Sequence, residues 1–308
     1  MNKNKILTKA IAEKFLKDSE SVKLWKFTSI EDAAAQALAQ HKGDLWLGGL
    51  TSLSVTTAQA LARHQGYLGL PGLKTITGGA AEALARQKGE IDLSGLESLS
   101  DAAAMALSKR QARLDLGALT SLNNSSGHLA LALLLAKQGG AINLHGLAKL
   151  SDEAAWALAQ HEKIRVQSGC AAIVNLDGLT SLSVSAAQAL AKIEGNLLLN
   201  GLTSLNEATA EQLAKHKGFL QLAGLKSLSN GAAQALAQHE GYLRLDGLKS
   251  LSDAAAQALA RHKGRLYLNG LKSLSDAAAQ ALATCHGELF LAGAAQRKWT
   301  HKIGRAHV

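Results

Sequence analysis

Histidine recurs at one place in a repeated segment of this chain, and imidazole can serve as a metal ligand or a general base. The residues are His41, His64, His161, His216, His239 and His262, with His286 one place later in its segment. A metal site needs several ligands within one coordination sphere. The repeat instead places each histidine at the end of a separate predicted helix, about 8–10 Å from the next. We therefore expect no metal site, and polar helix ends where a cation complements the helix dipole.

Serine, aspartate and histidine are the residues of a hydrolytic triad, and all three are abundant here. Serine and aspartate open the predicted helices and histidine closes them, whereas a triad requires direct hydrogen bonds between its members. The sequence lacks GxSxG, HExxH, GxxxxGK[ST] and GxGxxG motifs. Cys170 is a candidate reactive thiol, although an incidental cysteine is the better interpretation. We predict no enzyme activity, no catalytic residue and no cofactor.

These residues belong to a unit of 23 residues, seen best in residues 243–265, LRLDGLKSLSDAAAQALARHKGR, and their near copy 266–288. Two units are longer, with extra residues around 123–135 and 164–172. Such insertions form loops or lengthened helices, and they either carry function or reflect neutral drift. Units begin at Val22, Leu45, Leu68, Ile91, Leu114, Ile142, Val174, Leu197, Leu220, Leu243, Leu266 and Leu289.

Within a unit the hydrophobic period changes from two to that of a helix. Leu243 and Leu245 alternate with polar residues and predict a short strand with both leucines inward. Gly247 predicts a turn at positive φ. Ser252 is the expected N-cap of an alanine-rich helix, and Gly264 is its expected stop. A single unit buries too little to fold alone, so the stack is the folding unit.

The pattern LxLxGLxSLSDAAAQALA resembles that of bacterial leucine-rich-repeat proteins with helix-bearing units, and is most similar to their cysteine-containing subclass. That subclass carries Cys or Asn after the strand, where Leu179, Leu202, Leu225 and Leu248 stand here, so its side-chain ladder is expected to be missing. The resemblance covers residues 22–293. It implies an α/β fold, a curved right-handed solenoid with parallel strands on the concave face and helices on the convex face.

The ends of the chain depart from the repeat. Residues 1–21 are predicted to contain a capping helix over residues 5–18, because the first repeat has no neighbour on one side. Residues 22–293 are expected to form the solenoid, with eleven units and the start of a twelfth. Residues 294–308 are interpreted as a broken tail, in which residues 302–308, KIGRAHV, resemble a translated sequencing adapter.

Charge and composition narrow the class of protein. The net charge is +9, but much of it comes from lysines in residues 1–26 and from the tail, and the repeats are almost neutral. A basic stripe along the fold is therefore not expected, and neither is a nucleic-acid partner. The start has no apolar signal region, and no apolar run is long enough to span a membrane. We expect a cytoplasmic protein.

Aromatic and arginine residues gather at positions that flank the strand leucines. Such residues are typical of binding hot spots, although aromatic residues also favour strands without a ligand. We predict a non-catalytic scaffold that binds a protein or peptide on the concave face. The alternatives are a carbohydrate or other polymer on the same aromatic residues and, more weakly, the substrate-reading adaptor of a ubiquitin-ligase-like assembly. The candidate binding residues are Trp25, Trp46, Tyr67, Phe219, Tyr242, Arg244, Arg265, Tyr267 and Phe290.

Overall fold

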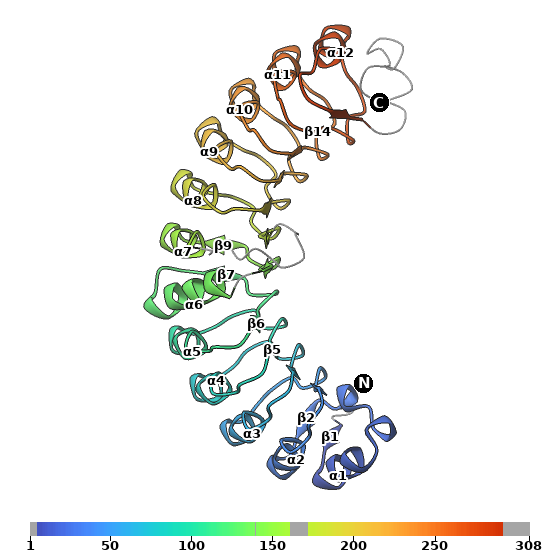
Figure 1. The fold of residues 1–308 in the computed structure, drawn as a ribbon, viewed down its shortest axis with the longest axis vertical. Coiled ribbons are helices and arrows are strands. Elements are labelled where there is room, and N and C mark those ends of the chain that lie inside the picture. The colour runs from blue at the N-terminus through green and yellow to red at the C-terminus, as the bar shows by residue number, and fades with distance from the viewer. Residues whose placement is uncertain (1–4, 139, 161–171, 292–308) are drawn as a thin grey trace. The chain divides into compact units, whose positions relative to one another are not determined.

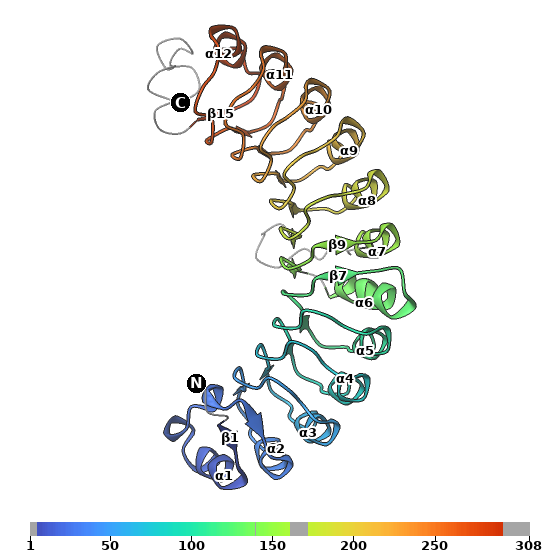
Figure 2. The ribbon, with the colours of Figure 1, turned by 180° about the vertical axis from the view of Figure 1, so that it is seen from behind.

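A computed structural model of the chain describes residues 5–138, 140–160 and 172–291. The chain divides into two compact units, Met1–Gln138 and Gly139–Val308. In each unit short strands alternate with short helices (Figure 1). The strands line up along one side of the unit and the helices along the other, which is also seen from behind (Figure 2).

The first unit contains a parallel sheet in the order β3-β4-β5-β6 and a separate parallel pair, β1 with β2. Neighbouring strands of the sheet pair residues one repeat apart, Leu45 with Leu68 and Leu68 with Ile91. The strands are β1 (Ile6–Leu7), β2 (Ser29–Ile30), β3 (Leu45–Trp46), β4 (Leu68–Gly69), β5 (Ile91–Asp92), β6 (Leu114–Asp115) and β7 (Ser121–Leu122). The helices are α1 (Lys9–Lys17), α2 (Asp32–Leu38), α3 (Val55–Leu61), α4 (Gly78–Ala85), α5 (Asp101–Leu107) and α6 (Ser126–Lys137), with 3-10 helices η1 (Ser19–Ser21) and η2 (Leu24–Lys26).

The second unit contains a seven-stranded parallel sheet in the order β15-β14-β13-β12-β11-β10-β8. The same one-repeat register pairs Leu220 with Leu243 and Leu243 with Leu266. Parallel strands at this spacing confirm the predicted α/β repeat. The strands are β8 (Ile142–Asn143), β9 (Lys149–Leu150), β10 (Ile173–Asn175), β11 (Asn196–Leu198), β12 (Leu220–Gln221), β13 (Leu243–Arg244), β14 (Leu266–Tyr267) and β15 (Leu289–Phe290). The helices are α7 (Asp152–Leu158), α8 (Val184–Leu190), α9 (Glu207–Leu213), α10 (Asn230–Leu236), α11 (Asp253–Leu259) and α12 (Asp276–Ala283).

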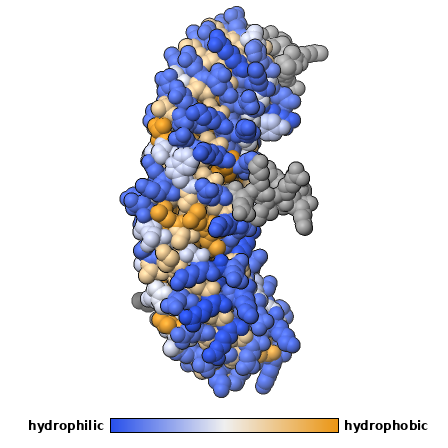
Figure 3. Space-filling view, turned by 60° about the vertical axis from the view of Figure 1, so that its left-hand side comes forward, coloured by the Kyte–Doolittle hydropathy of each residue, from blue (hydrophilic) through white to orange (hydrophobic). Residues whose placement is uncertain are grey.

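Leucine and alanine form the core between the two layers. Leu243 and Leu245 point inward from the strand and Leu248 follows them, and all three are fully buried. Ala256 and Leu259 of α11 are buried opposite them, as predicted. Small alanines let neighbouring helices approach closely, while leucines fill the space between helix and strand. Figure 3 shows mostly hydrophilic side chains on the helix side, with hydrophobic ones gathered over α6, where Leu133 is exposed.

The residue before most repeat helices caps that helix, and at Ser54, Ser183, Ser252 and Ser275 it also bonds to the previous repeat. Ser252 Oγ accepts a hydrogen bond from Ala255 N at 3.1 Å and donates one to Asn230 Oδ1 at 2.7 Å. Ser54 bonds to Asp32 in the same way. The cap therefore satisfies a helix end that would otherwise lack a partner, and it joins adjacent repeats.

Replacing Ser252 with alanine is expected to destabilise the protein by about 1 kcal/mol, because the first turn of α11 loses its acceptor. Chemical denaturation followed by circular dichroism measures the change. Ser250→Ala is the control, because Ser250 is exposed just before the cap. Equal stability of the Ser252 and Ser250 variants would show that the cap contributes nothing.

The physical reason predicted for glycine at two positions, Gly247 and Gly264, was wrong. Among the described residues, only Gly140 and Gly195 have positive φ, so Gly247 and Gly264 are not left-handed turn residues. A β-carbon on Gly247 would lie 2.3 Å from the carbonyl oxygen of Ala223, and one on Gly264 would lie 2.1 Å from that of Gly241. Glycine occupies these positions because the backbones of adjacent repeats approach too closely for a side chain.

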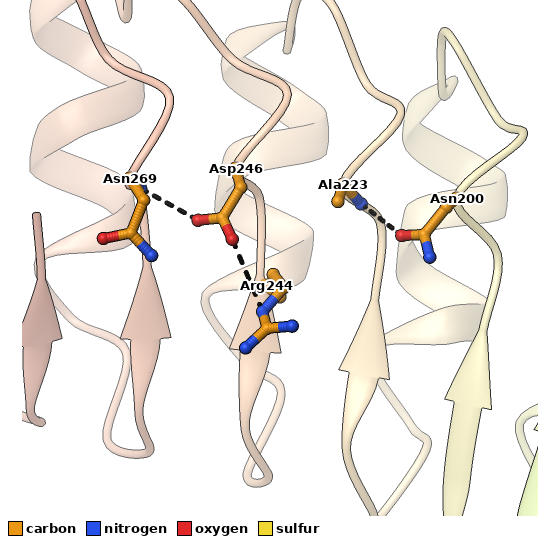
Figure 4. A network of polar contacts seen from close by, with 5 residues as sticks. All are labelled: Asn200, Ala223, Arg244, Asp246 and Asn269. Carbon is orange, nitrogen blue, oxygen red and sulfur yellow. Dashed lines mark hydrogen bonds and ion pairs between the residues drawn. The ribbon is translucent and has the colours of Figure 1, made fainter. Parts of the chain in front are cut away.

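A polar ladder replaces the one that the subclass builds at its Cys or Asn position. Asn200 Oδ1 accepts the backbone N–H of Ala223 at 2.9 Å, and Asp246 Oδ1 accepts that of Asn269 at 2.8 Å (Figure 4). Asp177 Oδ1 accepts the N–H of Asn200 in the same way. Each acceptor stands two residues after the end of a strand and bonds to the same position of the next repeat.

The structure differs from the predictions near the start. Residues 24–26 form η2 where the first repeat was expected to have a strand. The predicted helix over residues 5–18 is shorter, because Ile6 and Leu7 pair with β2 before α1 begins. The insertion around residues 123–135 lengthens a helix, giving the 12 residues of α6. Most of residues 164–172, and all of residues 294–308, lie outside the described residues.

Candidate binding surface

Two outward positions on each strand carry nearly all of the candidate residues. The leading position directly precedes the first buried strand residue, and the middle position lies between the two buried ones. Strand alternation sends both side chains to the face away from the core. In the second unit the leading position holds Phe219, Tyr242 and Arg265 on successive repeats, and the middle position holds Arg244, Tyr267 and Phe290. We call these six residues the aromatic–arginine cluster.

Arg244 lies at the centre of this cluster. Its guanidinium carbon is 5.3 Å from the ring centre of Phe219 and 5.0 Å from that of Tyr267. Its Nε also lies 3.4 Å from Asp246 Oδ2 (Figure 4). On the far side of Tyr267, the ring of Phe290 stacks at 4.5 Å and 11°. These four residues therefore form a continuous row of contacts across β12 to β15, in which Tyr267 and Phe290 are stacked while the rings of Phe219 and Tyr267, 6.5 Å apart, are tilted by 59°.

Arg265 makes a second stack beside the first. Its guanidinium carbon lies 4.8 Å from the ring centre of Tyr242, and its Nε donates to Glu288 Oε2 at 2.7 Å. Glu288 raises the pKa of Arg265 above its already high ordinary value, so the guanidinium stays charged. Both arginines of the cluster thus have a carboxylate partner and an aromatic partner, which fixes their planes before any ligand arrives.

The cluster remains accessible despite these contacts. Tyr242 is 45% exposed and Phe290 is 37% exposed, although both are large hydrophobic side chains. Short strands hold the backbone beneath them in a hydrogen-bonded ladder. An exposed and preordered group of aromatic and arginine side chains can bury area on a partner with little loss of conformational entropy.

Trp46 and Tyr67 form a smaller group on the first unit. Their ring centres lie 4.8 Å apart, and Tyr67 Oη donates to Asp92 Oδ2 at 3.2 Å. Burial, and then the negative charge of Asp92, raise the pKa of Tyr67 to about 12. Trp46 also covers Gly69, where an added β-carbon would lie 2.9 Å from Cε3 of the indole.

Trp25 is not part of a strand face. It lies in η2, it is 56% exposed, and Lys26 Nζ is 5.4 Å from its ring centre. The sequence-based assignment of Trp25 to a strand position was therefore wrong, because the chain turns before the sheet begins at β3.

The histidine column is buried, which differs from the expected polar helix ends. His64, His216, His239 and His262 are each at most 1% exposed. Their rings stack, with centres 6.1 Å apart for His216 and His239 and 6.0 Å apart for His239 and His262. Burial lowers the pKa of all four. These imidazoles are therefore neutral core residues at neutral pH, and they do not act as cations at the helix ends.

Two residues that the sequence analysis passed over occupy the same column. Gln87 Nε2 donates to Gly66 O at 2.8 Å, and Arg110 Nη1 donates to Leu84 O at 2.7 Å. Both side chains are buried, with 3% exposure each. Gln87 and Arg110 stand at the same position of their repeats as His64 does, so an alignment of the repeats would have identified both residues.

Other candidate chemistry is sparse. Within the described residues, no three His, Cys, Asp or Glu side chains come together as a metal ion would require. Cys285 is buried, and burial raises the pKa of its thiol, which disfavours the reactive thiolate. Cys170 and His161 lie outside the described residues. None of the helices in the described ranges is long and apolar enough to cross a bilayer.

Of the comparisons with known proteins, only the one with solved structures finds proteins similar to this chain. No family model matches the sequence, and no curated protein matches it. One similar structure is a leucine-rich-repeat protein of Leptospira interrogans, with 17% identity and a TM-score of 0.48, covering 92% of this chain and 69% of that one. Another is TLR13 in complex with ssRNA13, with 16% identity and a TM-score of 0.40. This second match covers 86% of the present chain and 44% of the other.

The internal register identifies the fold independently of those matches. Parallel strands pair residues that lie one repeat apart, and the leucines of the strands point into the core. Strands such as β13 are followed by a helix with a side-chain cap. The chain has a leucine-rich-repeat fold. In this leucine-rich-repeat chain the position after the strand holds buried leucine, for example Leu248, so membership of the cysteine-containing subclass stays a prediction.

Proposed function

We propose that this leucine-rich-repeat chain is a non-catalytic scaffold that binds a protein or peptide on its strand face. The observation that carries the proposal is the aromatic–arginine cluster on β12 to β15. Its row of contacts joins Phe219, Arg244, Tyr267 and Phe290, and Tyr242 contacts Arg265 beside it. Tyrosine and arginine are the residue types that most often anchor protein interfaces.

A carbohydrate ligand is the second candidate, and the packing of the rings weighs against it. A sugar stacks on a free aromatic face, but Tyr267 has Arg244 on one side and Phe290 on the other. Arg265 covers one face of Tyr242 in the same way. The cluster therefore offers ring edges, hydroxyl groups and guanidinium planes, which suit the mixed surface of a protein better than a pyranose ring.

An affinity pull-down with the full chain as bait, beside a glycan array, distinguishes the two candidates. Direct binding of a purified protein identified in the pull-down supports the proposal. Retention on the array without a protein partner supports the carbohydrate. Recovery of ubiquitin-ligase subunits in the pull-down would support the alternative that the chain is the substrate-reading adaptor of a ubiquitin-ligase-like assembly.

For an identified partner, Tyr242→Ala and Tyr267→Ala are each expected to weaken binding about thirtyfold, because an anchor at an interface contributes about 2 kcal/mol. Titration calorimetry measures the loss, and thermal melting should show nearly unchanged stability for Tyr242→Ala, whose side chain is 45% exposed.

Gln257→Ala is the matched control, because Gln257 is exposed on α11 in the same repeat as Tyr242. It should leave affinity within twofold. Loss of binding in the Gln257 variant with normal binding in both tyrosine variants would place the site on the helix side and contradict the proposal.

A further inference from the structure

Lysines and exposed hydrophobic side chains occur together in residues 5–26, which we call the basic cap. The segment holds six lysines and three carboxylates, so its net charge is +3, and all six lysines are exposed. β1 and α1 lie at the end of the first unit, and no repeat of the described chain packs against their outer side (Figure 1). The lysines are Lys5, Lys9, Lys14, Lys17, Lys23 and Lys26.

Little of this charge is neutralised within the protein. Lys9 Nζ lies 3.6 Å from Glu13 Oε1, and both side chains are more than half exposed. Lys14 and Lys17 stand one turn apart at the end of α1, and neither they nor Lys23 forms an ion pair with a described residue. The negative end of α1 offsets only about half of one elementary charge. The basic cap therefore presents positive charge to solvent.

Three large hydrophobic side chains are exposed in the same short segment. Ile6 lies on β1 and faces outward, because the next residue, Leu7, is fully buried. Leu16 is exposed near the end of α1. Trp25 is the most exposed large hydrophobic residue in the described chain, and Lys26 Nζ lies near its ring. Exposed apolar side chains that gather in one place mark an interaction surface.

Hydrogen bonds and packing hold the basic cap in a defined arrangement. Thr28 N donates to Lys5 O at 2.9 Å, which places the residue before Ile6 close to the end of η2. β1 pairs in parallel with β2, and α1 packs against α2. The exposed side chains therefore project from an ordered backbone, and a partner would not need to order that backbone on binding.

The surface of an anionic bilayer matches both features of the basic cap. A lysine close to such a surface strengthens binding about fivefold. Tryptophan favours the level of the headgroups, and aliphatic side chains enter the boundary of the acyl region. A soluble polyanion would pair with the lysines but would give Ile6 and Leu16 no apolar surroundings.

We propose that the basic cap binds the surface of an anionic phospholipid bilayer, with Trp25 at the level of the headgroups and the lysines of α1 against the lipid phosphates. Charge complementarity, together with the exposed hydrophobic residues beside the lysines, is the argument for this occupant. The proposal does not rest on the proposed function, because the aromatic–arginine cluster belongs to the second unit.

Co-sedimentation of the full chain with sucrose-loaded vesicles tests the proposal. Vesicles of phosphatidylcholine and phosphatidylglycerol in equal parts should bind the protein, and vesicles of phosphatidylcholine alone should not. Lys14→Gln with Lys17→Gln should weaken binding at least tenfold and reduce its dependence on salt. Trp25→Ala should weaken binding at least fivefold. Trp25→Phe should keep most of the affinity but lose the blue shift of tryptophan fluorescence that accompanies entry of the indole into the interface.

Two matched controls separate this surface from the rest of the molecule. Lys226→Gln with Lys249→Gln removes the same charge from exposed residues of the second unit. Trp46→Ala removes a tryptophan of the first unit that is 52% exposed on β3. Both controls should leave vesicle affinity within twofold, and circular dichroism should show that every variant is folded.

The proposal is overturned if the anionic vesicles do not bind, if neutral vesicles bind equally well, or if the lysine and Trp25→Ala variants bind like the unaltered protein. Equal losses in the controls would likewise overturn it. Heparin that binds as tightly as the anionic vesicles, and as well in Trp25→Ala as in the unaltered protein, would assign the surface to a soluble polyanion instead. None of these outcomes affects the aromatic–arginine cluster, which is tested with other variants and an identified partner.

Discussion

Replacing Arg110 with alanine is expected to destabilise the protein by about 3 kcal/mol or more. The guanidinium is buried and donates to three backbone carbonyls, those of Leu84 at 2.7 Å, Gln87 at 3.2 Å and Gly89 at 2.6 Å. Alanine would leave these acceptors without their donor and would open a cavity. Burial lowers the pKa of Arg110 to about 10, which still leaves it charged at neutral pH.

Urea denaturation followed by circular dichroism at pH 7.5 measures the loss. Lys109→Ala, at the exposed neighbouring residue, should change stability by less than about 0.5 kcal/mol. Arg110→His should recover a substantial part of the loss, because imidazole fills the same position at His64 and His239. A change below about 1 kcal/mol in Arg110→Ala would show that water replaces the guanidinium without penalty.

Lowering the pH below about 6.5 is expected to destabilise the folded protein steeply. Burial lowers the pKa of His64, His216, His239 and His262 in the folded state. The unfolded chain therefore binds protons first as the pH falls. The stability contributed by the four histidines is complete above the unfolded pKa and is lost as the pH falls from there toward the lower folded values. Each histidine contributes at most about 1.4 kcal/mol per pH unit to the slope.

Urea midpoints measured from pH 8 to pH 5 test this dependence. The carboxylates of Asp32 and Asp101, whose pKa values are lowered by hydrogen bonds, act in a separate and more acidic range. His239→Gln is the informative variant, because Gln87 already fills this column and bonds to Gly66 O. This variant should reduce the slope of stability against pH by about the contribution of one histidine. Stability that stays constant from pH 7.5 to pH 5.5 would contradict the prediction.

The fold could be predicted because the information for it is local and repeated. Leu243 and Leu245 alternate with polar residues, Ser252 precedes an alanine-rich stretch, and the same order returns in most repeats. Strand, cap and helix follow from these patterns without knowledge of distant contacts. The prediction was wrong for the first repeat, because Leu24 keeps the 23-residue spacing to Leu47 but lies in η2.

Contacts between repeats could not be predicted from the pattern of a single unit. A histidine after a helix resembles an exposed polar end, and only the neighbouring repeats on both sides bury His239. Gly247 resembles a left-handed turn residue until the carbonyls of the previous repeat are in place. The positions of the candidate residues were predictable by column, but the contact of Arg244 with the rings of both Phe219 and Tyr267 depends on side-chain packing across three strands.

The polar ladder has a consequence for how such a chain can change in length. Asn200 and Asp246 each bond to a backbone N–H of the following repeat, a group that every residue except proline possesses. The N–H of Ala223 donates this bond as readily as that of Asn269 does. This hydrogen bond therefore places no demand on the side chain at that position of the incoming repeat. Duplication or loss of one 23-residue copy in the gene would preserve this hydrogen bond wherever the preceding copy carries Asn or Asp at that position, so repeat number can evolve separately from the residues on the strand face.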